Sequence, residues 1–274
     1  MQSRRLHRLS RFRRNKRQLR QRLRQRTFFA DRAMSEQMDK PRVLVLTGAG
    51  ISAESGIRTF RAADGLWEEH KVEDVATPEG FARDPALVQA FYNARRRQLQ
   101  SPEIAPNAAH LALAKLEQEL GDRFLLVTQN VDNLHEKAGS THVIHLHGEL
   151  TKVCSSRDPY DPAYIRQLTP NHSDVAPGTR AGDGSLLRPY IVFFGEAVPN
   201  IEKAAEEAMG ADIFVIIGTS LNVHPAAGLL HYVRPGTPVY YIDPNPASVP
   251  EWVTVIPLPA TKGVEQLARI LHAG

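Results

Sequence analysis

The stretch from Arg42 to Trp67, RVLVLTGAGISAESGIRTFRAADGLW, decides the fold of this chain. Its first apolar, β-branched run, VLVL at residues 43–46, predicts a fully buried strand. The sequence GAGISA at residues 48–53 then fits the G-x-G-x-x-G/A pattern of dinucleotide sites. The first glycine permits a tight strand-to-helix turn, and the second lets the backbone approach a pyrophosphate. The stretch therefore predicts a strand, a phosphate-binding turn and a helix.

The glycine pattern also occurs in turns that bind no nucleotide, so the residues that follow it matter. In an ordinary dinucleotide dehydrogenase, an acidic residue about 20 positions further on ends the second strand and holds the adenosine ribose. This interval instead contains Arg58, Phe60, Arg61 and Trp67, which indicate a loop. A loop rich in arginine and aromatic groups beside a phosphate site is typical of a lid over a ligand. A hydride-transferring dehydrogenase is therefore disfavoured.

Five ordered motifs resemble those of the sirtuins, the family of NAD-dependent protein deacylases. They are GAGISAESGIRTFR at 48–61, TQNVD at 128–132, HGE at 147–149, FGE at 194–196 and GTS at 218–220. The resemblance covers residues 41–272, diverges at about 152–188, and is greatest to the bacterial CobB-like type. It implies an α/β fold: a Rossmann-like parallel sheet with helices on both faces, plus a smaller, divergent module. The alternation of strand and helix patterns along the chain favours the same architecture.

The resemblance implies NAD-dependent removal of acetyl and succinyl groups from protein lysines. NAD is consumed as a co-substrate, and nicotinamide and O-acyl-ADP-ribose are released. His147 matches the catalytic histidine of the family, and Asn130 accompanies it in the reaction. A histidine with a pKa near neutrality can take a ribose hydroxyl proton at pH 7. The sequence has eleven histidines, and His135 and His145 are the competitors for this role.

The resemblance also implies a dinucleotide site at the ends of the strands. Asp243 stands where the family usually has Asn, but a carboxylate can still accept hydrogen bonds from ribose hydroxyls. The expected nucleotide-binding residues are Gly48, Ala49, Gly50, Ser52, Ala53, Ile57, Phe60, Arg61, Trp67, Gln129, Asn130, Val131, Asp132, Gly218, Thr219, Ser220, Asp243, Asn245 and Ala260.

A pair of side chains in the helical pattern from Pro78 to Gln100 points to the acyl group. Tyr92 and Arg95 are three residues apart and share one face of the helix. They can be a half-buried phenol and a snorkelling guanidinium, or together a receptor for a carboxylate. A Tyr-x-x-Arg pair at this place resembles that of sirtuins which accept succinyl-lysine, and Ala76 would leave room for the longer acyl chain.

The resemblance places the substrate peptide along the FGE segment. Phe194, Gly195 and Glu196 would bind the peptide backbone by strand addition, opposite Val223. An ordinary buried strand that ends in a turn is the alternative interpretation of this segment.

Most sirtuins carry a zinc module with two CxxC pairs where this chain diverges. Residues 152–188 contain Cys154, the only cysteine of the chain, and one histidine, His172. A structural zinc site needs four ligands, so we expect no zinc. A single cysteine also excludes an internal disulfide and fits a reducing cytoplasm. No run of the sequence has the apolar length of a transmembrane segment.

Residues 1–40 form a basic arm before the domain at 41–272. Residues 1–33 hold thirteen basic side chains and one acid, whereas the remaining 21 basic and 29 acidic residues give a charge of −8. As a helix, the arm would place Leu9, Phe12, Leu19 and Leu23 on one side, which suits binding to anionic lipid or nucleic acid. The alternative is a solvated, disordered charge run.

Two other functions remain open on this scaffold. One is a protein ADP-ribosyltransferase, against which the Tyr92–Arg95 pair and Glu196 argue. The other is a non-catalytic NAD-binding module, against which His147 and Asn130 argue.

Overall fold

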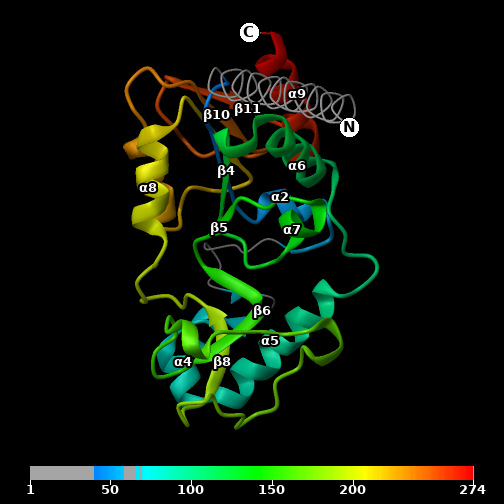
Figure 1. Ribbon diagram of the computed structural model, residues 1–274, viewed down its shortest axis with the longest axis vertical. Helices are drawn as coiled ribbons and strands as arrows, with labels where there is room; N and C mark the ends of the chain where they lie inside the picture. Colours follow the sequence, from blue (N-terminus) through cyan, green and yellow to red (C-terminus); the bar gives the residue numbers. More distant parts are fainter. Residues whose placement is uncertain (1–39, 59–65, 68–69, 274) are drawn as a thin grey trace, which may run out of the picture. The chain divides into compact units, whose positions relative to one another are not determined.

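The computed structural model describes residues 40–58, 66–67 and 70–273 (Figure 1). The described residues from Arg42 onward form one compact unit, to which the following description applies. Residues 1–39 of the predicted arm, and the predicted ligands Phe60 and Arg61, lie outside the described residues. In the part that the structure describes, no helix combines the length and the apolar character needed to span a membrane.

A six-stranded parallel sheet forms the centre of the unit, in the order β11-β10-β9-β1-β4-β5. All five residues of β1 are buried, as expected for an apolar strand with neighbours on both sides. Thr47, the last residue of β1, is level with Thr128 of β4 and Ile217 of β9, so the loops that follow these strands begin side by side. The strands are β1 (Val43–Thr47), β4 (Phe124–Thr128), β5 (Val143–His145), β9 (Ile213–Ile217), β10 (Val239–Ile242) and β11 (Val253–Ile256).

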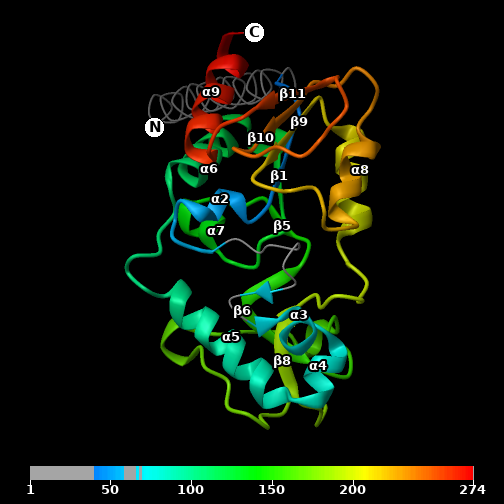
Figure 2. The ribbon, with the colours of Figure 1, turned by 180° about the vertical axis from the view of Figure 1, so that it is seen from behind.

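Helices cover both faces of this sheet (Figures 1 and 2). Helices α6 (Ala108–Leu120) and α9 (Ala260–Ala273) share one hydrophobic core with Val43, Val45 and Val215. Helix α8 (Ile201–Gly210) and the 3-10 helix η5 (Ala226–Tyr232) share the other core with Leu44 and Leu46. The predicted α/β, Rossmann-like architecture is therefore confirmed. Shorter elements are α2 (Gly50–Ala53), η2 (Gly121–Arg123) and α7 (Leu134–Ala138).

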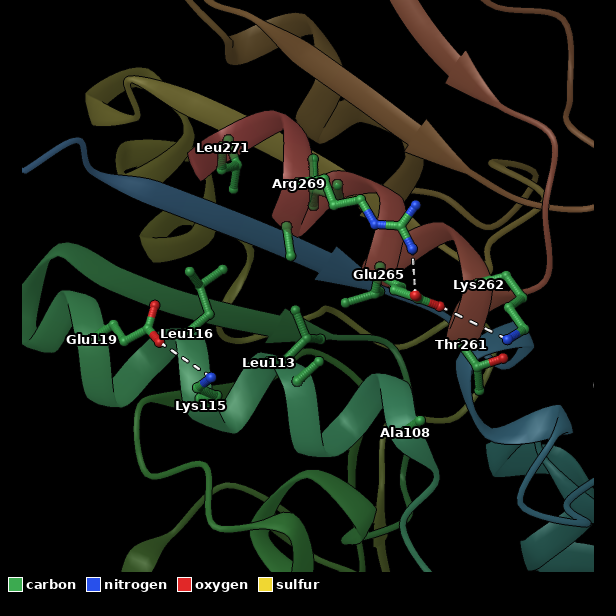
Figure 3. A pocket seen from close by; sticks show the side chains of 14 residues that line it. Ala108, Leu113, Lys115, Leu116, Glu119, Thr261, Lys262, Glu265, Arg269 and Leu271 are labelled. Carbon is green, nitrogen blue, oxygen red and sulfur yellow. Dashed lines mark hydrogen bonds and ion pairs between the residues drawn. The ribbon is translucent and has the colours of Figure 1, made fainter. Parts of the chain in front are cut away.

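Helices α6 and α9 lie side by side and leave an apolar hollow of about 880 Å³ between them (Figure 3). Leu113, Leu116 and Leu271 contribute to its lining, and ion pairs such as Lys115–Glu119 lie at its edge. None of the predicted site residues that the structure describes lines this hollow. It is a feature of helix packing, separate from the ends of the strands.

A third core lies between α5 and a three-stranded antiparallel sheet, β7-β6-β8. Helix α5 begins after Asp84, whose carboxylate caps Leu87 N–H, and Pro85 occupies its first position. The expected continuous helix is therefore divided at Asp84. The elements are β2 (Leu66–Trp67), β3 (His70–Lys71), α3 (Val72–Val75), α4 (Pro78–Arg83), α5 (Pro85–Leu99), β6 (Gly148–Ser155), η3 (Pro162–Tyr164), β7 (Arg166–Gln167), η4 (Pro170–His172) and β8 (Leu187–Ile191).

Side-chain hydrogen bonds from α5 fasten the divergent segment. The Asn93 amide donates to the Val175 carbonyl and accepts from Val175 N–H, each at 2.9 Å. Gln89 Nε2 donates to the Leu187 carbonyl at 2.6 Å, and Arg96 Nε donates at 2.9 Å to the carbonyl of Leu150, which lies on β6 just before the segment. All three side chains are buried, so each bond is formed away from competing water.

Cys154 belongs to the same region and is fully buried on β6. Its thiol lies 3.6 Å from the Pro189 carbonyl oxygen. Burial raises the pKa of Cys154 to about 12, so the sulfur remains a protonated thiol at neutral pH.

We predict that Asn93→Ala destabilises the protein by about 2 kcal/mol or more, because it leaves two buried backbone groups of Val175 without partners. The matched control is Arg97→Ala, which removes an exposed ion pair between α5 and the neighbouring Asp174 and should cost about 1 kcal/mol or less. Urea unfolding of both variants measures the difference. Equal effects would contradict this account of the segment.

Candidate active site

A cavity of about 520 Å³ lies at the carboxyl ends of β1, β4, β9 and β10. Ligands bind at this edge in open α/β sheets because the loops after neighbouring strands converge there. The loops after these four strands, together with residues 191–198 after β8, contribute most of the lining.

The glycine turn after β1 packs directly on the turn after β9. Gly50 N–H donates to the Gly218 carbonyl at 2.8 Å. A Cβ atom on Gly50 would lie 2.6 Å from Gly218 Cα, and one on Gly48 would lie 2.7 Å from Thr219 Cβ. Gly218 itself has a φ of +62°, a conformation that favours glycine. Glycine is therefore required at these positions for the two turns to pack against each other at the edge of the sheet.

A buried polar network joins three of the predicted residues that line the cavity. Ser52 Oγ donates to Asp132 Oδ2 at 3.1 Å and accepts from Asn130 Nδ2 at 3.2 Å. Asn130 N–H donates to Thr128 Oγ1 at 3.0 Å, which fixes the backbone as well as the side chain. Burial raises the pKa of Asp132, although Leu134 N–H and Ser52 oppose the shift. The network holds the Asn130 amide in one orientation.

Two buried histidines lie under the same network, with their rings 4.8 Å apart. His135 Nε2 is 3.0 Å from Thr47 Oγ1, and His110 Nε2 is 3.5 Å from Ser52 Oγ. Burial lowers the pKa of His110 to about 4 and lowers that of His135 as well. Because both pKa values are lowered, the two imidazoles are uncharged at neutral pH. Neither residue lines the cavity, and both support the loops that surround it.

His147 does line the cavity. Its Nδ1 is 3.0 Å from the Gln129 carbonyl oxygen, which can only accept, so Nδ1 carries the proton. The neutral imidazole then has its lone pair on Nε2. Burial lowers the pKa of His147, although the bond to Gln129 opposes the shift, and the free base predominates at neutral pH. Of the three candidate histidines, only His147 lines the cavity.

The Glu196 carboxylate on the cavity wall is held by an ion pair. Arg188 donates to its two oxygens at 2.6 and 2.9 Å, and Phe193 N–H donates to Oε2 at 2.8 Å. The Arg188 guanidinium also stacks 3.8 Å from the centre of the Phe193 ring. This arrangement fixes the turn that contains Phe194 and Gly195. Phe194 N–H in turn donates to the Ala76 carbonyl at 2.9 Å.

Tyr92 and Arg95 are not among the residues that line the cavity. Tyr92 is fully buried on α5, and its ring lies 6.2 Å from that of Phe193, which does line it. Burial raises the pKa of Tyr92, so its phenol is a hydrogen-bond donor at neutral pH. The half-buried Arg95 guanidinium lies 5.1 Å from the centre of the Phe91 ring. Tyr92 therefore stands one layer of side chains behind the cavity wall, whereas Arg95 lies beside Phe91, which does not line the cavity.

The structure brings the other described members of the predicted set together around the cavity. For Trp67 it describes only the backbone, within β2. The predicted residues on the lining are Gly48, Ala49, Gly50, Ser52, Ala53, Ile57, Ala76, Gln129, Asn130, Val131, Asp132, His147, Phe194, Gly195, Glu196, Gly218, Thr219, Ser220, Val223, Asp243, Asn245 and Ala260.

Several lining residues were missed by the sequence reasoning. Glu54 is one: its carboxylate accepts from Thr261 N–H at 3.0 Å and from Thr261 Oγ1 at 2.9 Å, so it ties the glycine turn to the start of α9. Val198 and His224 are others. Their positions shortly after the FGE and GTS motifs were the only signal for these two.

Comparison with known proteins decides the family. The model of the Sir2 family matches residues 48–225. The chain belongs to the Sir2 family. The NAD-dependent protein deacylase of Escherichia coli strain K12 is 65% identical over 237 residues, which is 85% of this chain and 82% of that protein. The NAD-dependent protein deacylase of Bacteroides thetaiotaomicron is 60% identical over 231 residues, 84% of this chain and 97% of that protein.

Solved Sir2 structures share the fold. A Sir2 homolog–NAD complex matches with a TM-score of 0.73 and 36% identity, covering 88% of this chain and 94% of that one. A mutant Sir2 homologue with ADP-ribose matches with a TM-score of 0.75 and 35% identity, covering 88% and 96%. A Sir2–p53 peptide–NAD+ complex matches with a TM-score of 0.65 and 26% identity, covering 88% and 98%. The sirtuin resemblance of the five motifs is therefore confirmed at the level of the family.

Proposed function

We propose that this chain is an NAD-dependent protein deacylase that removes acetyl and succinyl groups from protein lysines. The observation that carries the proposal is the position of His147: a neutral imidazole on the wall of the cavity that the glycine turn closes. The names of the relatives, NAD-dependent protein deacylases at 60–65% identity, support the same activity.

The residues present fit a dinucleotide. A cavity of about 520 Å³ is within the usual size of cofactor sites, roughly 300–1,000 Å³. Its polar lining suits the parts of NAD: amide and hydroxyl groups at Gln129, Asn130 and Thr219, and the Asp243 carboxylate for a ribose. Burial raises the pKa of Asp243, although Asn245 N–H opposes the shift. When bound, NAD supplies an electrophilic ribose carbon and nicotinamide as the leaving group.

The chain itself supplies enclosure, orientation and one base. His147 Nε2 takes the proton of a ribose hydroxyl, while the Nδ1 bond to Gln129 keeps the ring in the required tautomer. Asn130, fixed through Ser52, orients the nicotinamide ribose. The turn at Phe194–Glu196, opposite Val223, takes the peptide backbone by strand addition. The products are lysine, nicotinamide and O-acyl-ADP-ribose.

The succinyl activity rests on Tyr92 and Arg95. Their i, i+3 spacing on α5 puts a phenol donor and a guanidinium on one helix face, a combination that suits a carboxylate. Ala76 lines the cavity with a small side chain, which leaves room for the longer acyl group. Since Tyr92 stands behind Phe193, a succinyl group would reach the pair on the Phe193 side of the cavity.

We further propose the domain boundaries, the way the divergent module is held, the cellular location and the role of the basic arm. Residues 41–272 are the deacylase domain, and its module at about 152–188 is held by α5 side chains such as Asn93 without zinc. Among the described residues, no group of three or more His, Cys, Asp or Glu side chains could hold a metal ion. The protein acts in the cytoplasm. The basic arm, residues 1–40, contacts anionic lipid or nucleic acid, and the excess of basic side chains in the arm supports this proposal.

We predict that His147→Asn lowers deacylation of an acetyl-lysine peptide by about 100-fold or more, the usual contribution of a general base. In the unmutated protein, turnover should rise with pH through a value below the ordinary 6.5, because burial lowers the pKa of His147 and only the neutral form accepts a proton. Peptide mass measured after incubation with NAD follows both effects. A peptide that gains ADP-ribose would instead indicate a transferase, and an unchanged peptide a binding module.

We predict that Arg95→Met reduces turnover of a succinyl-lysine peptide by roughly 10- to 150-fold, the value of one charge-assisted hydrogen bond. Turnover of an acetyl-lysine peptide should change little, since this acyl group has no carboxylate. The matched control is Arg97→Met, two residues further on an exposed face of α5. Equal loss with both peptides would refute a carboxylate receptor.

A further inference from the structure

His145 and Glu136 form a pair that the proposed reaction does not use. His145 is the last residue of β5, and Glu136 lies on α7. His145 Nε2 is 2.8 Å from Glu136 Oε1, and its Nδ1 is 3.1 Å from the Asn130 carbonyl oxygen. The His145 side chain is 9% exposed and that of Glu136 39%. The imidazole therefore bridges the carboxylate to the backbone of the predicted catalytic residue.

Both partners of this imidazole are acceptors. A carbonyl oxygen and a carboxylate have no proton to donate, so each ring nitrogen of His145 must carry one. The pair then holds one proton more than a neutral histidine beside a carboxylate. His147 differs in this respect, since its single bond to a carbonyl, that of Gln129, is satisfied by the neutral ring.

The two histidines hold consecutive carbonyls of one loop. His147 contacts that of Gln129 and His145 that of Asn130. The backbone of His145 is fixed in turn by Asn200 Nδ2, which donates to its carbonyl at 2.9 Å. The Asn130 peptide is thus fastened at its carbonyl by His145, at its N–H by Thr128, and at its side chain by Ser52.

We propose that Glu136 and His145 are a positioning pair: their shared proton holds the Asn130 backbone in the orientation that the reaction needs, and activity falls at alkaline pH when that proton is lost. The proposal rests on the deacylase function proposed above. Neither residue lines the cavity, so their action passes through Asn130.

The charges around the pair favour the protonated state. Burial alone would lower the pKa of His145, but the bond to Glu136, the charge of Glu136 and that of Glu149 on β6 outweigh it, and the pKa is raised. Burial alone would raise the pKa of Glu136, but His145 outweighs it, and the pKa is lowered. The other groups that interact with the pair are Asp132 after β4 and His135 on α7, which interact with His145, and His110 on α6 and Lys152 on β6, which interact with Glu136.

The sign of the pH effect follows from the raised pKa. The contact to Asn130 is complete below the ordinary histidine pKa of about 6.5 and is lost as pH rises through the higher value in the folded protein. His147 acts in the opposite direction, because its lowered pKa governs the rise of activity at acidic pH. Turnover should therefore pass through a maximum, with His147 on the acidic side and His145 on the alkaline side.

The experiment compares pH profiles of kcat and of KM for NAD in the full chain and three variants. In Glu136→Gln, the amide can donate to Nε2, so a neutral His145 keeps its Nδ1 bond to Asn130. This variant should remain active at pH 7 and lose the alkaline decline. His145→Phe keeps a ring but no hydrogen bond, and its kcat should fall about 10- to 100-fold, with less change in KM. His142→Gln is the control, since His142 pairs with Glu117 of α6 and should leave the profile unchanged.

Three results would overturn the proposal: a profile without an alkaline decline in the unmutated chain, a decline that persists in Glu136→Gln, or a full kcat in a folded His145→Phe. If His145→Phe does not fold, as circular dichroism would reveal, Glu136→Gln decides alone. The deacylase function is tested independently: it is refuted if the unmutated chain with NAD leaves an acyl-peptide unchanged. In that case the positioning pair is refuted as well. An active chain with unaltered variant profiles removes only the positioning pair.

Discussion

The close approach of two turns at the edge of the sheet is the constraint on which the rest of the structure depends. Because β1 lies between β4 and β9 in aligned register, the chain leaves these strands at one level. The turns that follow can coexist only with a hydrogen atom where Gly50 and Gly218 meet, since a side chain there would overlap with backbone. That contact closes one side of the cavity. The loop after β4 is held to the glycine turn by the bonds of Asn130 and Asp132 to Ser52, and the chemistry proposed for His147 requires this spacing to be constant.

Polar groups that are mostly uncharged support the site from below. Hydroxyl and imidazole groups at Thr47, Ser52, His110 and His135 link the loops in a region that excludes water. In such surroundings each hydrogen bond is strengthened, and an unpaired charge would be costly. Ion pairs lie at its margin, as with Glu136 and His145, or Arg188 and Glu196, whereas the Asp132 carboxyl lies inside the network and is bonded to Ser52 and to Leu134 N–H. The loops are therefore held rigidly although the floor of the site carries little net charge.

The parts of this protein that the sequence predicted well are those with a local signature. The glycine turn and the motifs around Asn130 and His147 are short and contiguous, and their spacing follows from the geometry of a strand and its turn. The bond from Glu136 to His145 could not be predicted, because it depends on how α7 packs against β5. The complete burial of Tyr92 could not be predicted either, because helical spacing shows which residues share a face but not what covers that face. The break at Asp84 was missed although an aspartate before a proline is a known helix start.

The burial of the Cys154 thiol on β6 affects how the purified protein behaves during storage in air. Thiolate is the species that attacks disulfides and peroxides, and Cys154 has almost none of it at neutral pH. As the chain contains no second cysteine, oxidative cross-linking between copies has no starting point in the folded state. Preparations kept without reductant should accordingly remain free of disulfide-linked dimers for as long as β6 stays folded.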